Sequence, residues 1–484
     1  MSTTAPSATG RDLLRTPGVG AFLKWRHARL TLQIVALAVA VAVVLHGLLG
    51  PPIAPRNLAT VVTWVHYRGL LVIALLAIGN LFCTGCPFVL VRDAARRAHA
   101  PARRWPRALR TKWIGLALLA AVLFVYELYD LWSLPAATAW LLLGYFGVAL
   151  AIDVVFRGAS FCKYLCPIGQ FNFAASTLSP FEVTARDPAV CGTCRTADCI
   201  RGRRAPEAPA TVLRRGCELD LFVPAKVGNL DCTLCLDCVQ ACPHDNVAIA
   251  ARVPGAELAD DRRRSGIGRL AARPDIAALA VLFTFGALLN AFAMVSPAYV
   301  LEAWLARAMG VTSEGPVLLV IFASVLVALP AALLGTAAVV SRCIIGGPGT
   351  AVRATILRYA IALLPLGFGL WLAHYSFHLL TGVLTIVPVA QSAAADLAGW
   401  PILGEPLWRW LGMRPGAVFP IQFGFVLMGA LGSFATAYAL AERDAPERPA
   451  AAAAPWGVVL ALLAAAAIWV LTQPMEMRGV ELPG

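Results

Sequence analysis

The chain has 484 residues, of which 59% are hydrophobic and only 14% are charged. With a mean hydropathy of +0.73, this composition excludes an ordinary set of soluble domains and indicates a membrane protein with several spanning helices. The formal net charge of +13 is explained by membrane topology and contact with anionic lipid, so we expect no nucleic-acid partner.

Nine apolar stretches are long enough to cross a bilayer. They are expected near residues 30–49, 60–82, 113–132, 135–156, 275–296, 316–340, 357–379, 418–441 and 456–472. The predicted fold class is therefore a polytopic α-helical membrane protein of about nine helices. One long polar insert, residues 157–273, interrupts the series after the fourth helix.

The distribution of Lys and Arg predicts the orientation of these helices. If the N-terminus is cytoplasmic, 34 of the 40 Lys and Arg residues fall on the cytoplasmic side and 6 on the other. This asymmetry predicts a multi-pass protein of the bacterial inner membrane with a cytoplasmic insert and a periplasmic C-terminus. The first helix follows 29 polar residues without a small-residue cleavage site, so we expect an uncleaved signal anchor.

Twelve of the thirteen cysteines lie between Cys83 and Cys242, on the side predicted to be cytoplasmic. A reducing compartment disfavours disulfides and favours thiolate–metal chemistry. Two sets fall in the insert. The second has the spacing C-x2-C-x2-C-x3-C-P typical of bacterial ferredoxins, and the first is less regular.

In such double-cluster ferredoxins the fourth cysteine of a run ligates the other cluster. The first [4Fe-4S] cluster is therefore expected at Cys191, Cys194, Cys199 and Cys242, and the second at Cys217, Cys232, Cys235 and Cys238. Zinc is the alternative, because C-x2-C pairs also bind zinc. Three close cysteines that end in C-P are more typical of iron–sulfur proteins.

A second cysteine pattern is repeated at two predicted helix ends. The second helix ends in Cys83-x2-Cys86-Pro, and the fourth ends in Cys162-x3-Cys166-Pro. Both pairs are expected at the cytoplasmic membrane face. They could hold a third iron–sulfur cluster, form a redox-active dithiol set, or be ordinary apolar residues; the duplication argues against the last reading.

These twelve cysteines make the region of residues 60–250 resemble the NapH/NosR-type membrane polyferredoxins, a family that includes a copper-handling oxidase-accessory ferredoxin. Members share C-x3-C-P in both membrane motifs, whereas the first motif here is one residue shorter. The resemblance implies electron transfer across or along the membrane without identifying the final acceptor. Residues 275–484 match no pattern of the family.

The domain organisation follows from these patterns. Residues 1–29 form a cytoplasmic N-terminal segment, and residues 30–156 form a four-helix membrane domain with the two cysteine pairs. Residues 157–273 form a cytoplasmic insert with two [4Fe-4S] clusters that resembles a ferredoxin, and residues 274–484 form a five-helix membrane domain.

Histidines and methionines predicted at the outer face are further candidate ligands. His374 and His378 are spaced i and i+4, so they share one helix face and could bind haem, copper or quinone, or could be structural. His46 and His66 lie near the same face. Met475 and Met477 have a spacing used for Cu(I), although ordinary packing also explains them.

The sequence therefore predicts a membrane-bound iron–sulfur protein that passes electrons between cytoplasmic clusters and a quinone or an outer-face acceptor. Its partner would be a quinol or a redox protein, and enzymatic turnover by this chain alone is an open question. The alternative is a maturation factor for a periplasmic or membrane metalloenzyme that reduces or handles copper. A transporter or sensor gated by clusters is a third reading.

Overall fold

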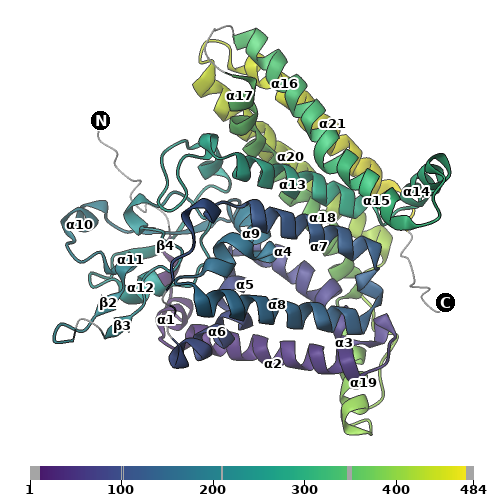
Figure 1. The fold of residues 1–484 in the computed structure, drawn as a ribbon, viewed down its shortest axis with the longest axis horizontal. Coiled ribbons are helices and arrows are strands. Elements are labelled where there is room, and N and C mark those ends of the chain that lie inside the picture. Colours follow the sequence, from purple (N-terminus) through teal and green to yellow (C-terminus); the bar gives the residue numbers. More distant parts are fainter. Residues whose placement is uncertain (1–10, 100, 102, 209–210, 346–350, 476–484) are drawn as a thin grey trace. The chain divides into compact units, whose positions relative to one another are not determined.

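The computed structural model describes residues 11–99, 101, 103–208, 211–345 and 351–475. This part of the chain is mostly helical (Figure 1). Eight of its helices are long and apolar enough to span a membrane, namely Ala28–Leu49, Leu58–Ala77, Pro135–Val155, Pro274–Phe292, Glu314–Ile344, Val352–Gly382, Pro415–Asp444 and Pro449–Thr472.

The observed helices differ in one respect from the nine that the sequence predicts. The stretch expected near residues 113–132 forms α7 (Trp113–Leu128), which has 16 residues. At 1.5 Å per residue it is about 24 Å long, shorter than the hydrocarbon thickness of about 30 Å. It ends early because Asp130, in the left-handed conformation, begins a separate turn of 3-10 helix.

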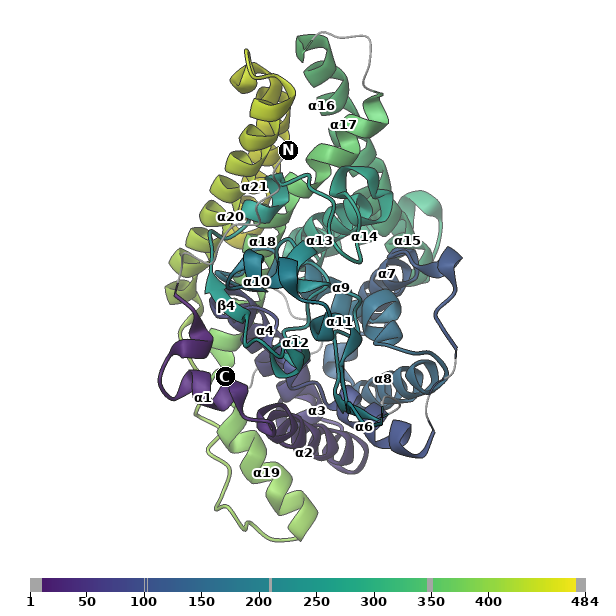
Figure 2. The same ribbon diagram turned by 90° about the vertical axis from the view of Figure 1, so that its left-hand side faces the viewer.

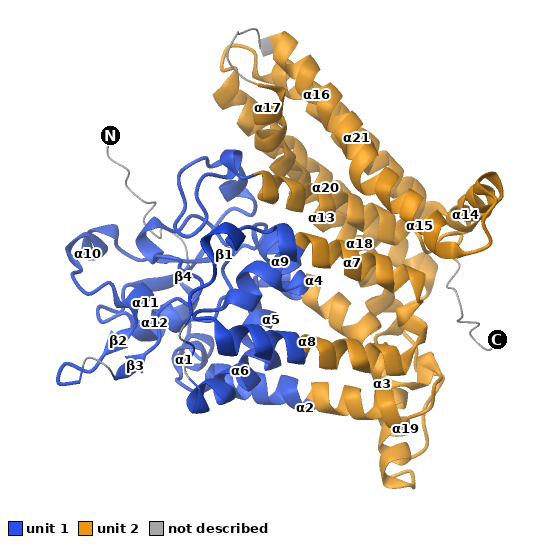
Figure 3. Cartoon of the chain, in the orientation of Figure 1, with its two compact units in different colours: residues 1–38, 74–115, 146–273 blue, residues 39–73, 116–145, 274–484 orange. Residues whose placement is uncertain are grey.

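The described chain divides into two compact units (Figure 3). Unit 1 comprises residues 1–38, 74–115 and 146–273, and unit 2 comprises residues 39–73, 116–145 and 274–484. The polar insert lies wholly in unit 1 and the C-terminal helices lie wholly in unit 2. The helices of residues 30–156 are shared between the two units, because the division runs through them.

Unit 2 is a bundle of apolar helices. Its closely packed members are α13 (Pro274–Phe292), α16 (Leu329–Ile345), α18 (Leu364–Gly382), α20 (Pro415–Asp444) and α21 (Pro449–Thr472). Helices α20 and α21 lie side by side (Figure 2). Helix α18 approaches α20 closely because Gly369 and Gly429 face each other, and a Cβ at Gly369 would lie 3.1 Å from the Gly429 Cα. Small residues allow such contacts between membrane helices.

The remaining elements of unit 2 are short or irregular. They are α3 (Leu58–Thr60), a π-helical segment (Val61–Tyr67), α4 (Arg68–Ala77, up to residue 73), α14 (Ser296–Met309), α15 (Glu314–Ala323), α17 (Val352–Tyr359) and α19 (Ile386–Ala398). Helix α14 ends at Gly310, whose φ of 65° is the left-handed conformation that glycine adopts without cost.

Unit 1 contains short helices and two small sheets. Strands β1 (Phe181–Ala185) and β4 (Val247–Ala251) pair antiparallel, and β2 (Arg203–Arg204) pairs with β3 (Val212–Arg214). The helices are α1 (Val19–Lys24), the first part of α2 (Ala28–Leu49), α5 (Leu81–Thr84), α6 (Pro87–Ala98), the last part of α8 (Pro135–Val155), α9 (Pro167–Ser176), α10 (Pro188–Thr193), α11 (Asp198–Arg201) and α12 (Asp237–Ala241).

The β1–β4 pair brackets the cysteine-rich segment, since β1 precedes the first cysteine of the insert and β4 follows the last. Val183 and Ile249, opposite each other in the pair, are buried in a core with Leu234 and Val239. Five of the insert cysteines pack against this core. The apolar strand pair therefore holds the ends of the segment together and fixes the cysteine loops between them.

A buried ion cluster around Glu257 supports the same region. Its carboxylate pairs with Arg252 and, at 3.1 Å, with Arg264, and it accepts a hydrogen bond from the Asn229 amide at 2.6 Å. Gly228 has a φ of 68°, and any Cβ there would collide with this carboxylate. Burial alone would raise the pKa of Glu257, but the two arginines and the amide outweigh it, so the pKa is lowered.

We expect stability to depend on the charge of Glu257. A carboxyl whose pKa is lowered by folding stabilises the protein above its unfolded pKa of about 4.3, and this contribution is lost as the pH falls through the lower, folded pKa. At pH 7 Glu257→Gln should lower the free energy of unfolding by about 3–5 kcal/mol, because it leaves buried arginines unpaired. Unfolding midpoints measured from pH 7 to pH 3 should converge for the two proteins at the acid end. The exposed Glu207 provides a control, and an equal loss in Glu207→Gln would contradict the assignment.

Candidate functional site

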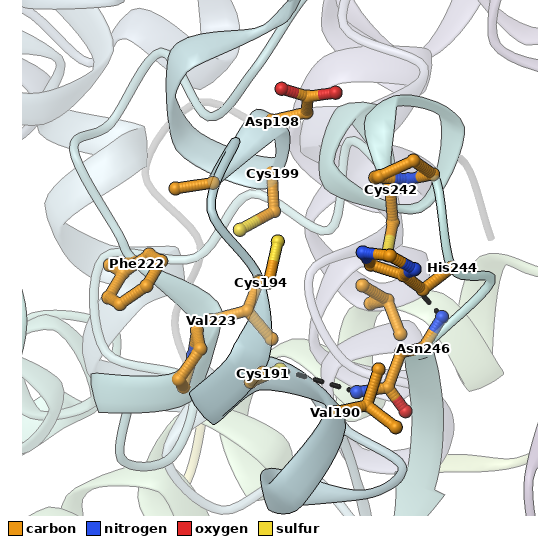
Figure 4. A pocket seen from close by; sticks show the side chains of 14 residues that line it. Val190, Cys191, Cys194, Asp198, Cys199, Phe222, Val223, Cys242, His244 and Asn246 are labelled. Atoms are coloured by element: carbon orange, nitrogen blue, oxygen red, sulfur yellow. Dashed lines mark hydrogen bonds between the residues drawn. The ribbon is translucent and has the colours of Figure 1, made fainter.

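The first cysteine set lines one pocket of unit 1 (Figure 4). Its four cysteines are Cys191, Cys194, Cys199 and Cys242, and its wall also includes His244, Asn246 and Val223. Asn246 donates from its side chain to the Cys191 sulfur at 3.3 Å and from its backbone to the Cys242 sulfur at 3.4 Å. Amide donors of this kind stabilise a thiolate.

The second set lines another pocket in unit 1. Its cysteines are Cys217, Cys232, Cys235 and Cys238, and the other lining residues are apolar except for Lys226 and Thr233. Cys242, only four residues after Cys238, lines the first pocket instead. The four cysteines that the sequence assigns to each cluster thus line one pocket each.

The loops around the two pockets are built alike. In each loop a residue with positive φ precedes an Asp-Cys pair that begins a short helix. These residues are Ala197 (φ 51°) before α11 and Leu236 (φ 62°) before α12. Such conformations cost an L-residue about 1–2 kcal/mol, and they turn successive backbone N–H groups inward. Strain repeated at the same place in both loops indicates a shared functional requirement.

The two helix-end pairs meet in a third pocket of unit 1. Cys83 lies in α5, Cys86 precedes α6, Cys162 lies in a π-helical turn (Phe161–Leu165), and Cys166 precedes α9. All four line one pocket. The proline that follows each second cysteine occupies the first helical position, where its missing N–H costs no hydrogen bond.

The sulfur atoms of the third pocket are buried and accept hydrogen bonds. Asn172 donates to the Cys83 sulfur at 3.4 Å, and the Gly169 amide donates to the Cys166 sulfur at 3.2 Å. Burial, followed by the nearby Cys86, raises the pKa of Cys83 to about 12, although Asn172 partly offsets the effect. Burial likewise raises the pKa of Cys162. As free thiols these groups would be weak nucleophiles.

The three pockets share parts of their walls. Val223 lines both the first and the second pocket, and Leu219, Thr233 and Cys235 line both the second and the third. The Thr84 hydroxyl at the end of α5 donates to the Leu234 carbonyl at 2.8 Å, which ties the loop of the second pocket to the helix that carries Cys83. The cysteine sets therefore form a continuous series inside unit 1.

Buried charges surround the third pocket. Arg29 makes two hydrogen bonds to Asp237, at 3.1 and 3.0 Å, and Arg92 contacts Glu218 at 2.7 Å. All four side chains line the pocket. Burial alone would lower the pKa of Arg92, but Glu218 and other carboxylates raise it overall, so this guanidinium stays charged. The two arginines of the pocket wall are thus each balanced by a carboxylate, Asp237 for Arg29 and Glu218 for Arg92.

Among the described residues, no three His, Cys, Asp or Glu side chains are grouped closely enough to hold a single metal ion. The four ligands of a cubane each bind a different iron at a different corner, so they lie farther apart than the ligands of one ion. The features of the cysteine pockets that bear on a cubane are therefore the four cysteines in each lining and the hydrogen-bond donors to their sulfur atoms.

His374 and His378 lie together in unit 2, with ring centroids 5.1 Å apart. Both are buried, and the Nε2 atom of each has no hydrogen-bond partner among the described residues. Tyr375 packs on His374, and the Arg68 guanidinium lies 4.8 Å from the centre of the Tyr375 ring. Arg68 also donates to the Tyr126 hydroxyl at 3.1 Å. This group forms a buried polar cluster among apolar helices.

His46 and His66 have structural roles instead. The His46 Nδ1 atom accepts from the Leu58 amide at 3.0 Å, and its Nε2 atom lies 3.1 Å from Asp396. The two ring nitrogens of His66 lie 3.1 and 3.4 Å from backbone carbonyls. Both ring nitrogens of His46 are therefore engaged, whereas a neutral His66 can donate to only one of its two neighbouring carbonyls.

The methionine pair gains no support as a copper site. Met475 forms a backbone bridge with Val295 in unit 2, and Met477 lies outside the described residues. Cys343, the thirteenth cysteine, is exposed on α16.

Sequence reasoning missed several residues of these sites. Arg68 enters the prediction only as one of the six Lys and Arg residues on the outer side, yet a charged residue inside an apolar span is itself a functional signal. The asparagines that donate to sulfur, Asn172 and Asn246, had no such signal, because their roles depend on contacts with cysteines far away in the sequence.

Comparison with known proteins gives one relative above the significance threshold. The chain is 31% identical over 94 residues to the "Putative electron transport protein YccM" of Escherichia coli K12, and the match covers 19% of this chain and 22% of that protein. The chain thus matches about a fifth of the relative's length. No protein-family model matches, and no solved structure matches.

Proposed function

We propose that this chain is a membrane-bound iron–sulfur electron-transfer protein of the NapH/NosR type. In this proposal unit 1 holds three [4Fe-4S] clusters in a ferredoxin-like insert and at the membrane cysteine pairs, and a quinone or quinol is the membrane partner. The observation that carries it is the series of three four-cysteine pockets with shared walls. The electron-transfer role of the partial relative agrees with it.

The residues present fit the proposed cofactor. Each pocket offers four thiol ligands, and sulfur atoms in the first and third pockets accept amide hydrogen bonds, which tune reduction potential. A bound cluster would supply one-electron transfer at each pocket. The protein's part is to hold the pockets in series, to exclude water from the third, and to surround that pocket with Arg29 and Arg92.

For the quinone we propose the polar cluster of unit 2. A quinone headgroup carries two carbonyl oxygens that need donors, and a hydroquinone carries two protons that need acceptors. The free Nε2 atoms of His374 and His378 can serve in either role, depending on the tautomer. The nearby Arg68 cation opposes a metal cation at the histidine pair but stabilises a partly reduced, anionic headgroup. We therefore favour quinone over haem or copper.

The test is an anaerobic purification of the full chain with measurement of iron, acid-labile sulfide, zinc, haem and copper. We expect about twelve irons and twelve sulfides per chain, since each cubane holds four of each. Stoichiometric zinc with fewer than about four irons would refute the proposal. Stoichiometric copper that depends on the histidine pair would favour the alternative, a maturation factor for a periplasmic or membrane metalloenzyme.

The second arm follows the visible absorbance after addition of a ubiquinol or menaquinol analogue. We expect quinol to bleach the wild-type chromophore, and His374→Ala/His378→Ala to keep its iron and its reduction by dithionite while its bleaching by quinol slows at least about tenfold, as when catalytic proton acceptors are removed. The matched control is His46→Ala, since His46 is also buried in unit 2 but has both ring nitrogens engaged. Equal rates in all three proteins would remove the histidine pair from the proposal.

A further inference from the structure

The segment between Cys199 and Cys217 carries an unusual amount of positive charge. It folds into the end of α11 and the β2–β3 hairpin, and an arginine of the first cysteine loop adds to it. All the arginines of this region are exposed; they are Arg195, Arg201, Arg203, Arg204, Arg214 and Arg215. We call these six residues the arginine face.

Four arginines of this face have no ion-pair partner in the part of the chain that the structure describes. The strand register places Arg203 directly opposite Arg214, and like charges at opposite positions of a strand pair are destabilising. Arg215 pairs with Asp93 at 2.7 Å. Among the ion pairs of the described residues, none involves Arg195, Arg201, Arg203 or Arg214. A local conflict of charge that the described residues do not compensate indicates a role in binding an anionic partner.

The arginine face is held firmly against the first pocket. The Cys217 amide donates to the Cys199 carbonyl at 2.9 Å, so both ends of the segment are joined at a cluster ligand. Gly216 packs against the backbone of Ile200 and Gly202 so closely that no Cβ would fit there. The charged hairpin therefore cannot move away from the cysteine loop without breaking this contact.

Apolar surface lies within the same hairpin. Val212 and Leu213 in β3 are 51% and 50% exposed. A small apolar centre with a charged rim is the usual anatomy of a protein docking surface. Cys194 of the neighbouring pocket is only partly buried, so the first pocket is open on its outer side.

We propose that the arginine face docks an acidic, soluble one-electron carrier protein, which exchanges its electron at the first pocket. This proposal rests on the proposed function, because it requires a redox group in that pocket. One electron leaves the reduced carrier and enters the oxidised cofactor of the first pocket; no bond forms or breaks, and the arginines remain charged throughout. Their contribution is to orient the carrier and to raise its rate of encounter.

An anionic lipid surface is the competing partner for a basic patch. The basic loop of residues 92–112 lies directly between membrane helices in the sequence, as expected for lipid contact. The β2–β3 hairpin does not follow or precede a spanning helix; it lies between the ligands of two cysteine pockets. This location favours a carrier protein.

The test uses the full chain in detergent and reduced flavodoxin, an acidic flavoprotein, as the probe under anaerobic conditions. The variant is Arg201→Glu/Arg203→Glu/Arg214→Glu. The matched control is Arg97→Glu/Arg104→Glu/Arg107→Glu, which reverses the same number of exposed arginines between the end of α6 and residue 107, elsewhere in unit 1. At low salt we expect the variant to lower the second-order rate constant for reduction by about 10- to 100-fold, whereas the control keeps it within about threefold. High salt should bring the three proteins together.

Binding of oxidised flavodoxin to immobilised protein gives a readout without electron transfer, and it should weaken in parallel. Reduction by dithionite, a small molecule, should stay unchanged in every protein, which verifies intact folding. If wild type shows no dithionite-reducible chromophore, the proposed function fails. If dithionite bleaches wild type but the variant reacts with and binds flavodoxin as wild type does, the docking proposal alone is overturned. If the variant no longer floats with phosphatidylglycerol vesicles but reacts with and binds flavodoxin as wild type does, the arginine face is a lipid-binding patch. That result would likewise overturn the docking proposal.

Discussion

The double substitution Cys83→Ser/Cys162→Ser is expected to lower the iron content from about twelve to about eight per chain. It removes one ligand from each helix-end pair, and a cubane that has lost two of four thiolates should not assemble. The first and second pockets have four cysteines of their own, so they should keep their iron. Iron and acid-labile sulfide, measured in the anaerobically purified protein, should fall together.

This experiment also separates the alternatives for the membrane pairs. A redox dithiol set would hold no iron, so the content would be about eight in wild type and unchanged in the variant. A matched control is Cys343→Ser, since Cys343 is an exposed cysteine in unit 2, and it should keep all twelve irons. Loss of every iron in the double variant would show that its fold collapses. The iron content of the single variant Cys83→Ser would then be compared with that of wild type instead.

The second large effect is expected from Arg92→Gln. Arg92 is almost fully buried and contacts three carboxylates, Glu218 at 2.7 Å, Asp93 at 2.8 Å and Asp153 at 3.6 Å. Removal of Arg92 takes away the ion-pair partner of the buried Asp153, while Glu218 and Asp93 stay paired with Arg96 and Arg215; a buried carboxylate stranded in this way costs about 3–5 kcal/mol of unfolding free energy. Unfolding by sodium dodecyl sulfate in mixed micelles, followed by tryptophan fluorescence, would measure the loss.

The exposed neighbour Arg97 offers a control, because Arg97→Gln removes the same charge from the same helix without breaking a buried contact. Its effect should stay within about 0.5 kcal/mol. Adding Glu218→Gln to Arg92→Gln should recover part of the loss, since it removes one of the carboxylates that lose Arg92 as a partner. If the double variant loses the sum of the two single effects, then Arg92 and Glu218 do not act as a pair.

The two proposed ends of the electron path differ in kind. At the first pocket, access for a soluble carrier depends on exposed arginines, whose effect is long-range and weakened by salt. At the unit 2 cluster, buried groups with few partners act at short range among apolar helices. Variants at one end should therefore leave the other half-reaction unchanged, which makes the two ends separately testable.

The sequence alone indicated the membrane class, and it predicted which cysteines of the insert would be grouped together. The length of an apolar stretch predicts a spanning helix, because the thickness of the bilayer sets how many apolar residues such a helix needs. The spacing predicted that Cys242 belongs to the first set and not with Cys238, because in double-cluster ferredoxins the fourth cysteine of a run ligates the other cluster; the structure places Cys242 in the first pocket. These are local properties of the chain, so they can be read without knowledge of its packing.

Only the tertiary structure decided what surrounds those cysteines. It brought the two helix-end pairs into one pocket with Arg29 and Arg92, and it gave the second and third pockets a shared wall at Cys235. It also placed Arg68 against Tyr375, beside the histidine pair. His46 instead has Asp396 as a hydrogen-bond partner. Such contacts join residues far apart in the chain, and helix packing, which spacing does not encode, determines which side chains meet.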